Sequence, residues 1–356
     1  MKILVWHWGR RGAGPRFAAE LSHALNALPG IAATLSLPKA AEILSLPDAP
    51  ACGWPVQTYT GLAGLAGRCL SAPFLLPRLD RHLAALLPDL AICAMPAMLD
   101  PLMFLALRRR AIPSVVIAHD AAPHPGDGGR ARAGWNRATL RRADAVAVLT
   151  RHVRASLAPI APAIQLCHPP FPMPPAPPPR AHGGALRVLS FGRMRAYKGL
   201  DLLAATLRLA TPDWDVRVIG AGPALADLPG ARVENRYVAE VELPQLFAWA
   251  DVVLLTHRAA SQSGVAAMAL GAGRFVVATA VGGLVEQLAG MPGAVLCPPD
   301  PGLLAAALRA LPFTPPAPID ARAAWRGMAA SLLAQANAAG LGRTARSEHD
   351  RRNGHG

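Results

Sequence analysis

The sequence predicts an α/β protein with two domains, each built around a parallel sheet. Short apolar segments that suit buried strands alternate with segments of helical periodicity along most of the 356 residues. A proline-rich stretch at residues 168–180 separates two parts, each of ordinary domain size. Apolar residues make up 52% of the chain, so each part can bury a core of its own.

A strand, a glycine-rich loop and a helix open the chain, which is the order of a Rossmann-like unit. Residues 2–8 are apolar enough for a strand, and the apolar side chains of residues 17–28 recur with helical spacing. The loop between them contains Gly9, Gly12 and Gly14, a spacing that departs from the Gly-x-Gly-x-x-Gly pattern of dinucleotide sites. A dinucleotide site therefore has little support.

The rest of the first domain, expected over residues 1–170, continues the alternation. Further strands are expected at residues 89–94, 114–118 and 143–150, with helices at 102–107 and 135–142. Residues 62–87 have apolar side chains at mixed spacing, broken by Pro73 and Pro77 and interleaved with basic residues. This pattern favours a helix pair that faces the core, with an amphipathic pair on a membrane surface as the alternative.

One strand of the first domain ends in two polar residues. His119 and Asp120 directly follow the buried strand at residues 114–118. Ligands of open α/β sheets bind beyond the carboxyl ends of the strands, so this pair lies where a ligand would bind. A pair that only caps the loop is the alternative, because such residues favour turns.

A proline-rich linker, placed at residues 171–182, joins the two domains. Proline lacks a backbone donor and fixes φ, which excludes a helix or a central strand and predicts an extended, semi-rigid spacer. In the second domain, residues 183–318, strands are expected at 186–191, 216–219, 251–255 and 275–279 and helices at 200–209, 243–249 and 265–270. A last helical stretch covers residues 319–336, and the polar tail, residues 337–356, is expected to be disordered.

Three cations follow the predicted strand at residues 186–191. Gly192 allows a sharp turn at the strand's end, and Arg193, Arg195 and Lys198 come next. This is a ligand-binding position of α/β sheets, and a lysine ammonium suits a phosphate oxygen as a point charge. A solvated loop is the alternative interpretation.

Two stretches of the second domain resemble the signatures of a known enzyme family. Residues 192–201 read Gly-Arg-Met-Arg-Ala-Tyr-Lys-Gly-Leu-Asp, and residues 261–286 open with Ser-Gln-Ser-Gly-Val and end with Thr-Ala-Val-Gly-Gly-Leu-Val-Glu. Both resemble the family 4 retaining glycosyltransferases of the GT-B fold, in the subgroup with a (Ser/Thr)-Gln-Ser-Gly-Val donor loop. The resemblance covers most of residues 183–320 and is looser over residues 1–170.

The resemblance implies two Rossmann-like domains whose parallel sheets face each other across a cleft. It places the acceptor side in the first domain and the nucleotide-sugar donor side in the second, with residues 319–336 crossing back to the first domain. It also implies that the catalytic residues are Arg193, Lys198 and His119. The donor-binding residues that it implies are Gly12, Gly14, Gly192, Ser261, Gln262, Ser263, Gly264, Val265, Gly283 and Glu286.

Transfer from such a donor leaves negative charge on the diphosphate, so stabilising that anion should be the largest catalytic effect. Arg193, Lys198 and the amides of residues 263–265 at a helix N-terminus could supply it. For Gly12 and Gly14 two interpretations stay open, an ordinary tight turn or a loop that lets backbone amides approach the substrate.

The chain departs from the family pattern in its acidic residues. Many members carry two glutamates seven residues apart in this region, whereas here no acidic residue lies between Asp251 and Glu286. Neutral groups of Ser261, Gln262 and Ser263 could then bond the sugar hydroxyls. Glu286 is the remaining candidate for ribose, and a first-turn helix glutamate is its alternative role.

Composition limits the cofactors and partners. No carboxylate cluster for a divalent metal is visible in the sequence, so we expect a metal-independent reaction with no cofactor and the nucleotide sugar as co-substrate. The net charge of +14 invites a nucleic-acid partner, but only 16% of residues are charged and no nucleic-acid-binding motif occurs. A basic surface also suits anionic substrates or peripheral contact with anionic lipid.

The cellular location is expected to be cytoplasmic, with peripheral contact at the inner membrane face as a further expectation. Five scattered cysteines, an odd number without a Cys-x-x-Cys pair, indicate neither a disulfide framework nor a zinc site. The first apolar run ends at two arginines and is too short for a signal peptide, and no run of 18 apolar residues occurs.

Taken together, the residues and the resemblance predict a glycosyltransferase. It would move a sugar from a nucleotide-diphospho-sugar to a glycan or lipid-linked saccharide, and the resemblance implies retention of anomeric configuration. One alternative is a non-catalytic GT-B protein that binds sugar nucleotide or serves as a partner subunit. A sugar-nucleotide epimerase is another, although it would need acidic residues in the cleft.

Overall fold

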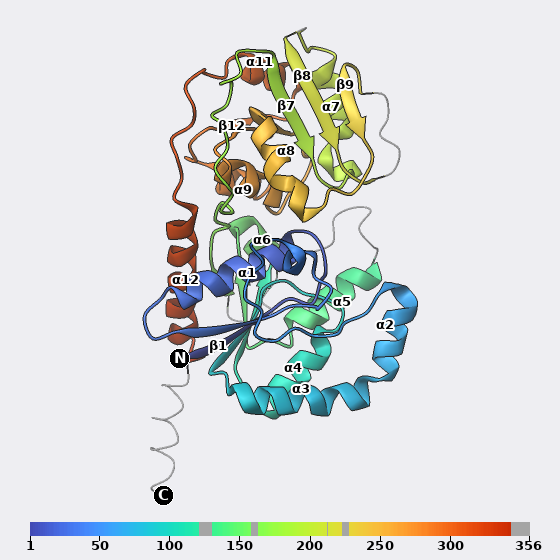
Figure 1. Ribbon diagram of the computed structural model, residues 1–356, viewed down its shortest axis with the longest axis vertical. Helices are drawn as coiled ribbons and strands as arrows, with labels where there is room; N and C mark the ends of the chain where they lie inside the picture. The colour runs from blue at the N-terminus through green and yellow to red at the C-terminus, as the bar shows by residue number, and fades with distance from the viewer. Residues whose placement is uncertain (121–129, 158–162, 212, 223–227, 343–356) are drawn as a thin grey trace, which may run out of the picture.

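The computed structural model describes residues 1–120, 130–157, 163–211, 213–222 and 228–342. These residues form two six-stranded sheets in which neighbouring strands are parallel. Figure 1 shows the two sheets one above the other, each flanked by helices. The predicted α/β class with two parallel sheets is confirmed.

The first sheet has the strand order β2-β1-β3-β4-β5-β6. Its strands are β1 (Lys2–Trp6), β2 (Ala32–Ser36), β3 (Leu90–Cys93), β4 (Ser114–Ala118), β5 (Ala145–Val148) and β6 (Ala163–Gln165). The helices of this half are α1 (Ala13–Asn26), α2 (Gly61–Leu70), α3 (Ala72–Leu86), α4 (Asp100–Arg109), α5 (Arg130–Leu140) and α6 (Arg151–Ser156). Helix α1 begins inside the predicted glycine loop, at Ala13, because Gly12 takes a positive φ of 79° that turns the chain into the helix.

The second sheet has the order β12-β11-β10-β7-β8-β9. Its strands are β7 (Leu186–Phe191), β8 (Trp214–Ile219), β9 (Ala231–Glu234), β10 (Val252–Leu255), β11 (Phe275–Thr279) and β12 (Ala294–Cys297). Its helices are α7 (Leu200–Leu207), α8 (Leu243–Trp249), α9 (Gly264–Gly271), α10 (Leu284–Leu288) and α11 (Pro301–Arg309). The chain starts this sheet in the middle, so β8 lies on one side of β7 and β10 on the other.

The apolar core follows the alternation of side chains along the central strands. Ile3 and Val5 belong to a cluster that continues into the second half through Phe171 of the linker and the side chains of α9. Leu4 and Trp6 point to the other face, where α3 and α4 cover the sheet. One core cluster therefore joins both halves of the chain, and burial on both faces explains the continuous apolar strands.

The last helix, α12 (Ala321–Ala338), returns to the first half and packs against α1. The indole Nε1 of Trp325 donates a hydrogen bond to the carbonyl of Pro170 at 2.9 Å, and Arg322 pairs with Glu20 at 2.6 Å. The helix extends two residues into the segment for which disorder was expected. Residues 343–356 of that segment lie outside the described residues.

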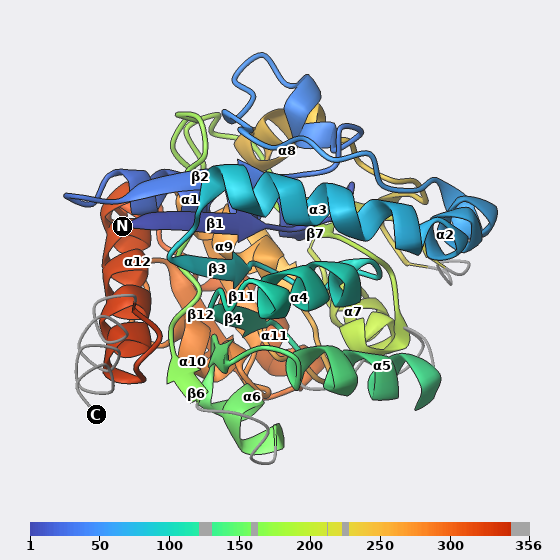
Figure 2. The same ribbon diagram turned by 90° about the horizontal axis from the view of Figure 1, so that it is seen from below.

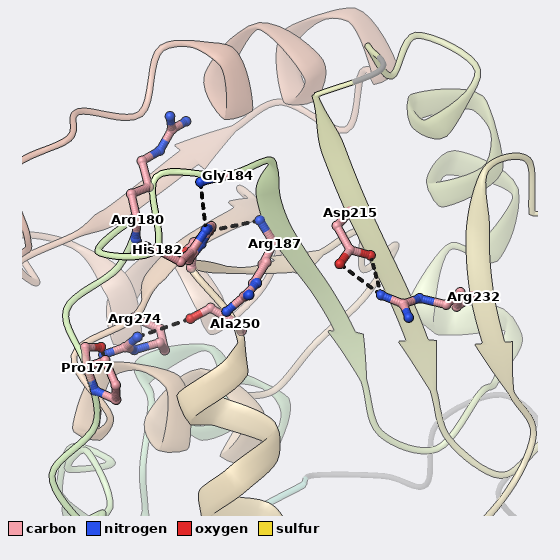
Figure 3. A network of polar contacts seen from close by, with 10 residues as sticks. Pro177, Arg180, His182, Gly184, Arg187, Asp215, Arg232, Ala250 and Arg274 are labelled. Atoms are coloured by element: carbon pink, nitrogen blue, oxygen red, sulfur yellow. Dashed lines mark hydrogen bonds and ion pairs between the residues drawn. The ribbon is translucent and has the colours of Figure 1, made fainter.

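Polar groups at the amino ends of β7 and β10 hold the linker to the second sheet (Figure 3). The buried Asp251 carboxylate accepts the backbone N–H groups of Arg180 at 2.6 Å and Arg187 at 2.9 Å. The buried guanidinium of Arg274 donates to the carbonyls of Pro177 at 2.6 Å and Ala250 at 3.1 Å. These contacts fix the linker at the edge opposite to the strands' carboxyl ends.

Helix α3 lies on the face of the first sheet that points away from the second half, and α2 lies at the side of this half (Figures 1 and 2). Helix α3 buries Leu76, Leu79 and Leu83 in the core, which confirms the core-facing prediction for this helix. The junction of the two helices instead exposes 83% of Leu70 and 74% of Phe74. The described part of the chain contains no helix that is both long and apolar enough to span a bilayer.

The two halves also meet through polar contacts beside the linker. Glu286 of α10 accepts the backbone N–H groups of Arg151 at 2.8 Å and His152 at 3.0 Å, at the N-terminus of α6. Thr150, the N-cap of α6, donates its hydroxyl to the carbonyl of Ser261 at 3.2 Å. Burial opposes ionisation of Glu286, but the two backbone donors outweigh it and the pKa of the carboxyl is lowered.

We expect the variant Glu286→Gln to lose about 1 kcal/mol of stability at neutral pH, because a neutral amide replaces a carboxylate that accepts two N–H groups and solvent screens the site. The pKa of Glu286 in the folded protein lies below the ordinary value of 4.5. The contribution is therefore fully present above that value and is lost as the pH falls through the folded pKa. Urea unfolding of both proteins over this pH range measures the difference, and a difference independent of pH would contradict the assignment.

Candidate active site

The loops after β7 and β10 converge at the centre of the second sheet, where the strand order reverses. Such a switch point is where open α/β sheets bind ligands. A Cβ atom placed on Gly192 would lie 3.5 Å from Cγ2 of Val265 and 3.6 Å from Nζ of Lys198. The fold thus brings together the turn after β7, the predicted phosphate-binding lysine and the first turn of α9.

This convergence depends on backbone packing without side chains between the loops. A Cβ atom on Gly220 would lie 1.7 Å from the carbonyl oxygen of Gly192, and one on Gly199 would lie 2.0 Å from that of Thr256. Gly192 has φ of 116° and Gly199 has φ of 66°, both in the range that favours glycine. Larger residues would push the loops apart.

The predicted cations differ in their surroundings. Lys198 is half-buried, its ammonium lies 5.9 Å from the centre of the Tyr197 ring, and its carbonyl accepts the hydroxyl of Thr256 at 2.9 Å. Arg193 lies in the same loop with an exposed side chain. Lys198 is therefore the better positioned of the two for a ligand at the start of α9.

Two of the three polar residues of the donor loop, Ser261 and Ser263, make hydrogen bonds within the protein. Ser263 is the N-cap of α9, and its hydroxyl accepts the N–H of Ala266 at 3.2 Å. Ser261 is buried, and its carbonyl accepts the hydroxyl of Thr150. The side-chain oxygen of Gln262 is buried and, among the described residues, has no hydrogen-bond partner. Gln262 therefore has an unsatisfied buried acceptor in the donor loop.

The N-termini of α1 and α9 face each other. A Cβ atom on Gly264 would lie 3.4 Å from Cβ of Ala13, next to Gly12. No atom lies within 4 Å of the Cβ position of Gly12. The prediction that amides near Gly12 approach a substrate therefore stays compatible with the geometry and remains a prediction.

Gly14 has a structural role that the sequence does not reveal. A Cβ atom on Gly14 would lie 2.3 Å from Nε2 of His7, and one on Gly9 would lie 2.4 Å from it. The Nδ1 atom of this buried ring bonds the carbonyl of Met95 at 2.8 Å. Both glycines are thus required by the packing of His7, whether or not a substrate lies nearby.

His119 is enclosed rather than open to the donor site. Its ring is 6% exposed, packs edge-on against Phe17 at 4.6 Å, and bonds the carbonyl of Ala94 through Nε2 at 2.9 Å. Burial, and next the neighbouring His168, lower the pKa of His119 to about 3, so the ring is neutral at physiological pH. Contact of His119 with a donor sugar stays a prediction.

Gly283 packs against the donor loop, whereas Glu286 binds the N-terminus of α6. A Cβ atom on Gly283 would lie 1.7 Å from the carbonyl oxygen of Ser261, so only glycine fits there. Both carboxylate oxygens of Glu286 are occupied by the N-terminus of α6, a role that neither of the two sequence interpretations includes. Its contact with ribose is not seen in this arrangement and stays a prediction.

A group of three or more His, Cys, Asp or Glu side chains placed to hold a metal ion is not found among the residues that the structure describes. The groups near the switch point include the Lys198 ammonium and the first turn of α9. Such groups can bind an anion and the hydroxyls attached to it.

Comparison with protein families identifies both halves. Residues 11–167 match the family model described as a glycosyl transferase 4-like domain. Residues 185–312 match the model described as glycosyl transferases group 1. A search of curated proteins finds no match to the chain.

Solved structures share the fold over nearly the whole chain. Sucrose-phosphate synthase from Thermosynechococcus elongatus is 17% identical, with 99% of each chain covered and a TM-score of 0.62. HepE from Anabaena, in complex with UDP-glucose, is 15% identical, with 99% of this chain and 100% of that chain covered and a TM-score of 0.61. UDP-GlcNAc 2-epimerase from Neisseria meningitidis, bound to UDP-GlcNAc, is 13% identical, with 92% and 94% covered and a TM-score of 0.53.

Identities this low show a common fold, and the family rests on the two models that together span most of the chain. One model lies on each sheet, in the order in which the two domains follow along the sequence. The chain therefore belongs to the glycosyltransferases of the GT-B fold, with a glycosyl transferase 4-like domain followed by a group 1 domain.

Proposed function

We propose that this glycosyltransferase takes its sugar from a nucleoside-diphosphate sugar whose diphosphate binds between Lys198 and the first turn of α9. The observation that carries the proposal is the convergence of Lys198 and Val265 on Gly192. A cation and a helix N-terminus aimed at one point stabilise the charge that develops on the leaving diphosphate. The complexes of HepE with UDP-glucose and of the epimerase with UDP-GlcNAc support this donor class.

The donor sugar would be recognised by neutral groups. Gln262 offers a buried acceptor without a partner in the described part of the chain, and a sugar hydroxyl would satisfy it. Arg193, exposed in the same loop as Lys198, would contribute a second cation to the diphosphate. The (Ser/Thr)-Gln-Ser-Gly-Val loop of the resembled subgroup is consistent with this division of roles.

We further propose that the reaction needs no divalent metal and retains the anomeric configuration. Lys198 and Arg193 would take the part that a metal plays on the diphosphate in other transferases. The bond between the anomeric carbon and the phosphate oxygen breaks while the acceptor oxygen bonds the same face, and the leaving phosphate takes the acceptor's proton. The protein then needs no carboxylate base.

The acceptor is proposed to be a glycan or a lipid-linked saccharide at the cytoplasmic face of a membrane. The exposed Leu70 and Phe74 support peripheral contact, since Arg78 and Arg81 are exposed on the same helix as Phe74. Apolar side chains flanked by arginines suit an anionic bilayer surface, where each cation contributes roughly 1 kcal/mol.

Release of nucleoside diphosphate from UDP-, GDP- and ADP-sugars, with and without acceptors, tests the proposed function. We expect Lys198→Ala to lose roughly 100-fold or more in kcat/KM, because a cation on the leaving group is removed. Lys2→Ala is the matched control. Lys2 is exposed at the amino end of β1, in the first half of the chain, so its replacement should leave activity unchanged. Activity of Lys198→Ala close to that of wild type would reject the site, and donor binding without turnover would favour the non-catalytic alternative.

The proposed mechanism predicts full activity in the presence of a chelator. An NMR assay of the product should show the anomeric configuration of the donor. Loss of activity that magnesium restores would overturn the metal-independent proposal, and an inverted product would overturn retention.

Membrane contact predicts co-sedimentation with vesicles that contain anionic lipid and weaker binding to vesicles of zwitterionic lipid alone. The double variant Leu70→Ser, Phe74→Ser should bind several-fold more weakly, because two exposed apolar side chains are lost. Phe313→Ser is the control, since Phe313 is 77% exposed but lies in the second half. Equal binding by all three proteins would count against this surface.

A further inference from the structure

A buried glutamine holds the donor loop from behind. Gln287 of α10 is 7% exposed. Its side-chain oxygen accepts the N–H of Ser263 at 2.7 Å, and its side-chain nitrogen donates to the carbonyl of Ser263 at 2.9 Å. One side-chain amide therefore satisfies both backbone groups of a single residue.

Ser263, the residue to which Gln287 is hydrogen-bonded, sets the direction of α9. Ser263 is the N-cap, so its backbone determines where the amides of Gly264 and Val265 point. The carbonyl of Ser263 also accepts the N–H of Ala267 at 3.1 Å, within the first turn. Fixing the two peptide groups on either side of Ser263 fixes the helix end that the proposed function assigns to the diphosphate.

We infer that Gln287 is a positioning residue for the transfer, acting through the backbone of Ser263. The inference rests on the proposed function, because that function places the diphosphate at the N-terminus of α9. Helix amides stabilise a developing anion only where they point at it, and a displacement of about 1 Å can cost roughly 100-fold in rate.

The chemistry of the contact restricts the residue type. Position 287 needs one donor and one acceptor at the length of a glutamine side chain. Methionine has the length and neither group, and an ionised glutamate has two acceptors and no donor. A protonated glutamate supplies an O–H donor and a carbonyl acceptor, and therefore reproduces the glutamine contact.

The chain contains a matched control for the same contact. Gln335 of α12 accepts the N–H of Gln165 at 3.0 Å and donates to its carbonyl at 2.8 Å. This second glutamine clamp joins α12 to β6 in the first half, away from the donor loop. Gln335→Met thus removes an equivalent pair of bonds without touching the proposed site.

The experiment measures kcat and KM for the sugar nucleotide in Gln287→Met, Gln287→Glu and Gln335→Met, together with amide hydrogen exchange of residues 257–271. Near neutral pH we expect both Gln287 variants to lose about 10- to 100-fold in kcat, with a smaller change in KM, since the lost interaction acts mainly in the transition state. Gln335→Met should stay close to wild type. Near neutral pH, exchange of residues 257–271 should be faster in both Gln287 variants and unchanged in Gln335→Met.

The pH profile separates positioning from general destabilisation. Burial raises the pKa of a carboxyl at position 287, so Gln287→Glu should recover activity relative to wild type as the pH falls from about 8 to about 5. Gln287→Met should show no such recovery. Near-wild-type kcat in Gln287→Met, or equal losses in Gln287→Met and Gln335→Met, would overturn the inference.

A wild-type protein that releases no nucleoside diphosphate from any sugar nucleotide would overturn the proposed function instead. In that case faster exchange of residues 257–271 in Gln287→Met would still support the loop-holding contact. Unchanged exchange would overturn the contact as well, so the two failures are distinguishable.

Discussion

The structure depends on backbone lying directly on backbone where the loops of the second sheet meet. Gly220 lies on the carbonyl of Gly192, Gly199 on that of Thr256, and Gly283 on that of Ser261, each too close for any Cβ atom. Because nothing separates these loops, the ends of β7, β8, β10 and β11 form one continuous surface. Lys198 and the start of α9 both lie beside Gly192 at this surface.

The same kind of contact links the two halves. Gly271 leaves room for the carbonyl of Phe171, so the linker runs directly over α9, and Gly264 faces Ala13 at the start of α1. Glu286 then caps α6, while its neighbour Gln287 holds Ser263. Helix α10 therefore contacts the first half through Glu286 and the donor loop through Gln287. Through it the position of the donor loop is tied to the position of the first domain.

Much of the fold could be predicted from local pattern, because apolar strands bounded by glycines carry a strong signal. The predicted bounds of β4, β7, α8 and β11 agree with the structure. Two short elements have too little periodicity to be recognised. These are β9, with the sequence Ala-Arg-Val-Glu at the sheet edge, and the five-residue α10. The structure places Lys198 and Val265 beside Gly192, and their role in a donor site stays a prediction. The hydrogen bonds between Glu286 and the N-terminus of α6 were not predictable, because the partners of Glu286 lie 134 and 135 residues away in the sequence. The need for Gly14 also escaped the sequence, since it depends on the orientation of the His7 ring.

The packing of α9 accounts for the missing glutamates of the donor loop. Every residue of this helix from Val265 to Leu270 is buried, between the second sheet and the linker. A carboxylate at an inner position of this helix would lose its hydration, which costs several kcal/mol unless a cation pairs with it. In the proposed site, sugar recognition would then fall to the first turn and to the neutral Gln262. The first turn of α9 carries no acidic residue, and a helix N-terminus without a carboxylate favours a bound anion.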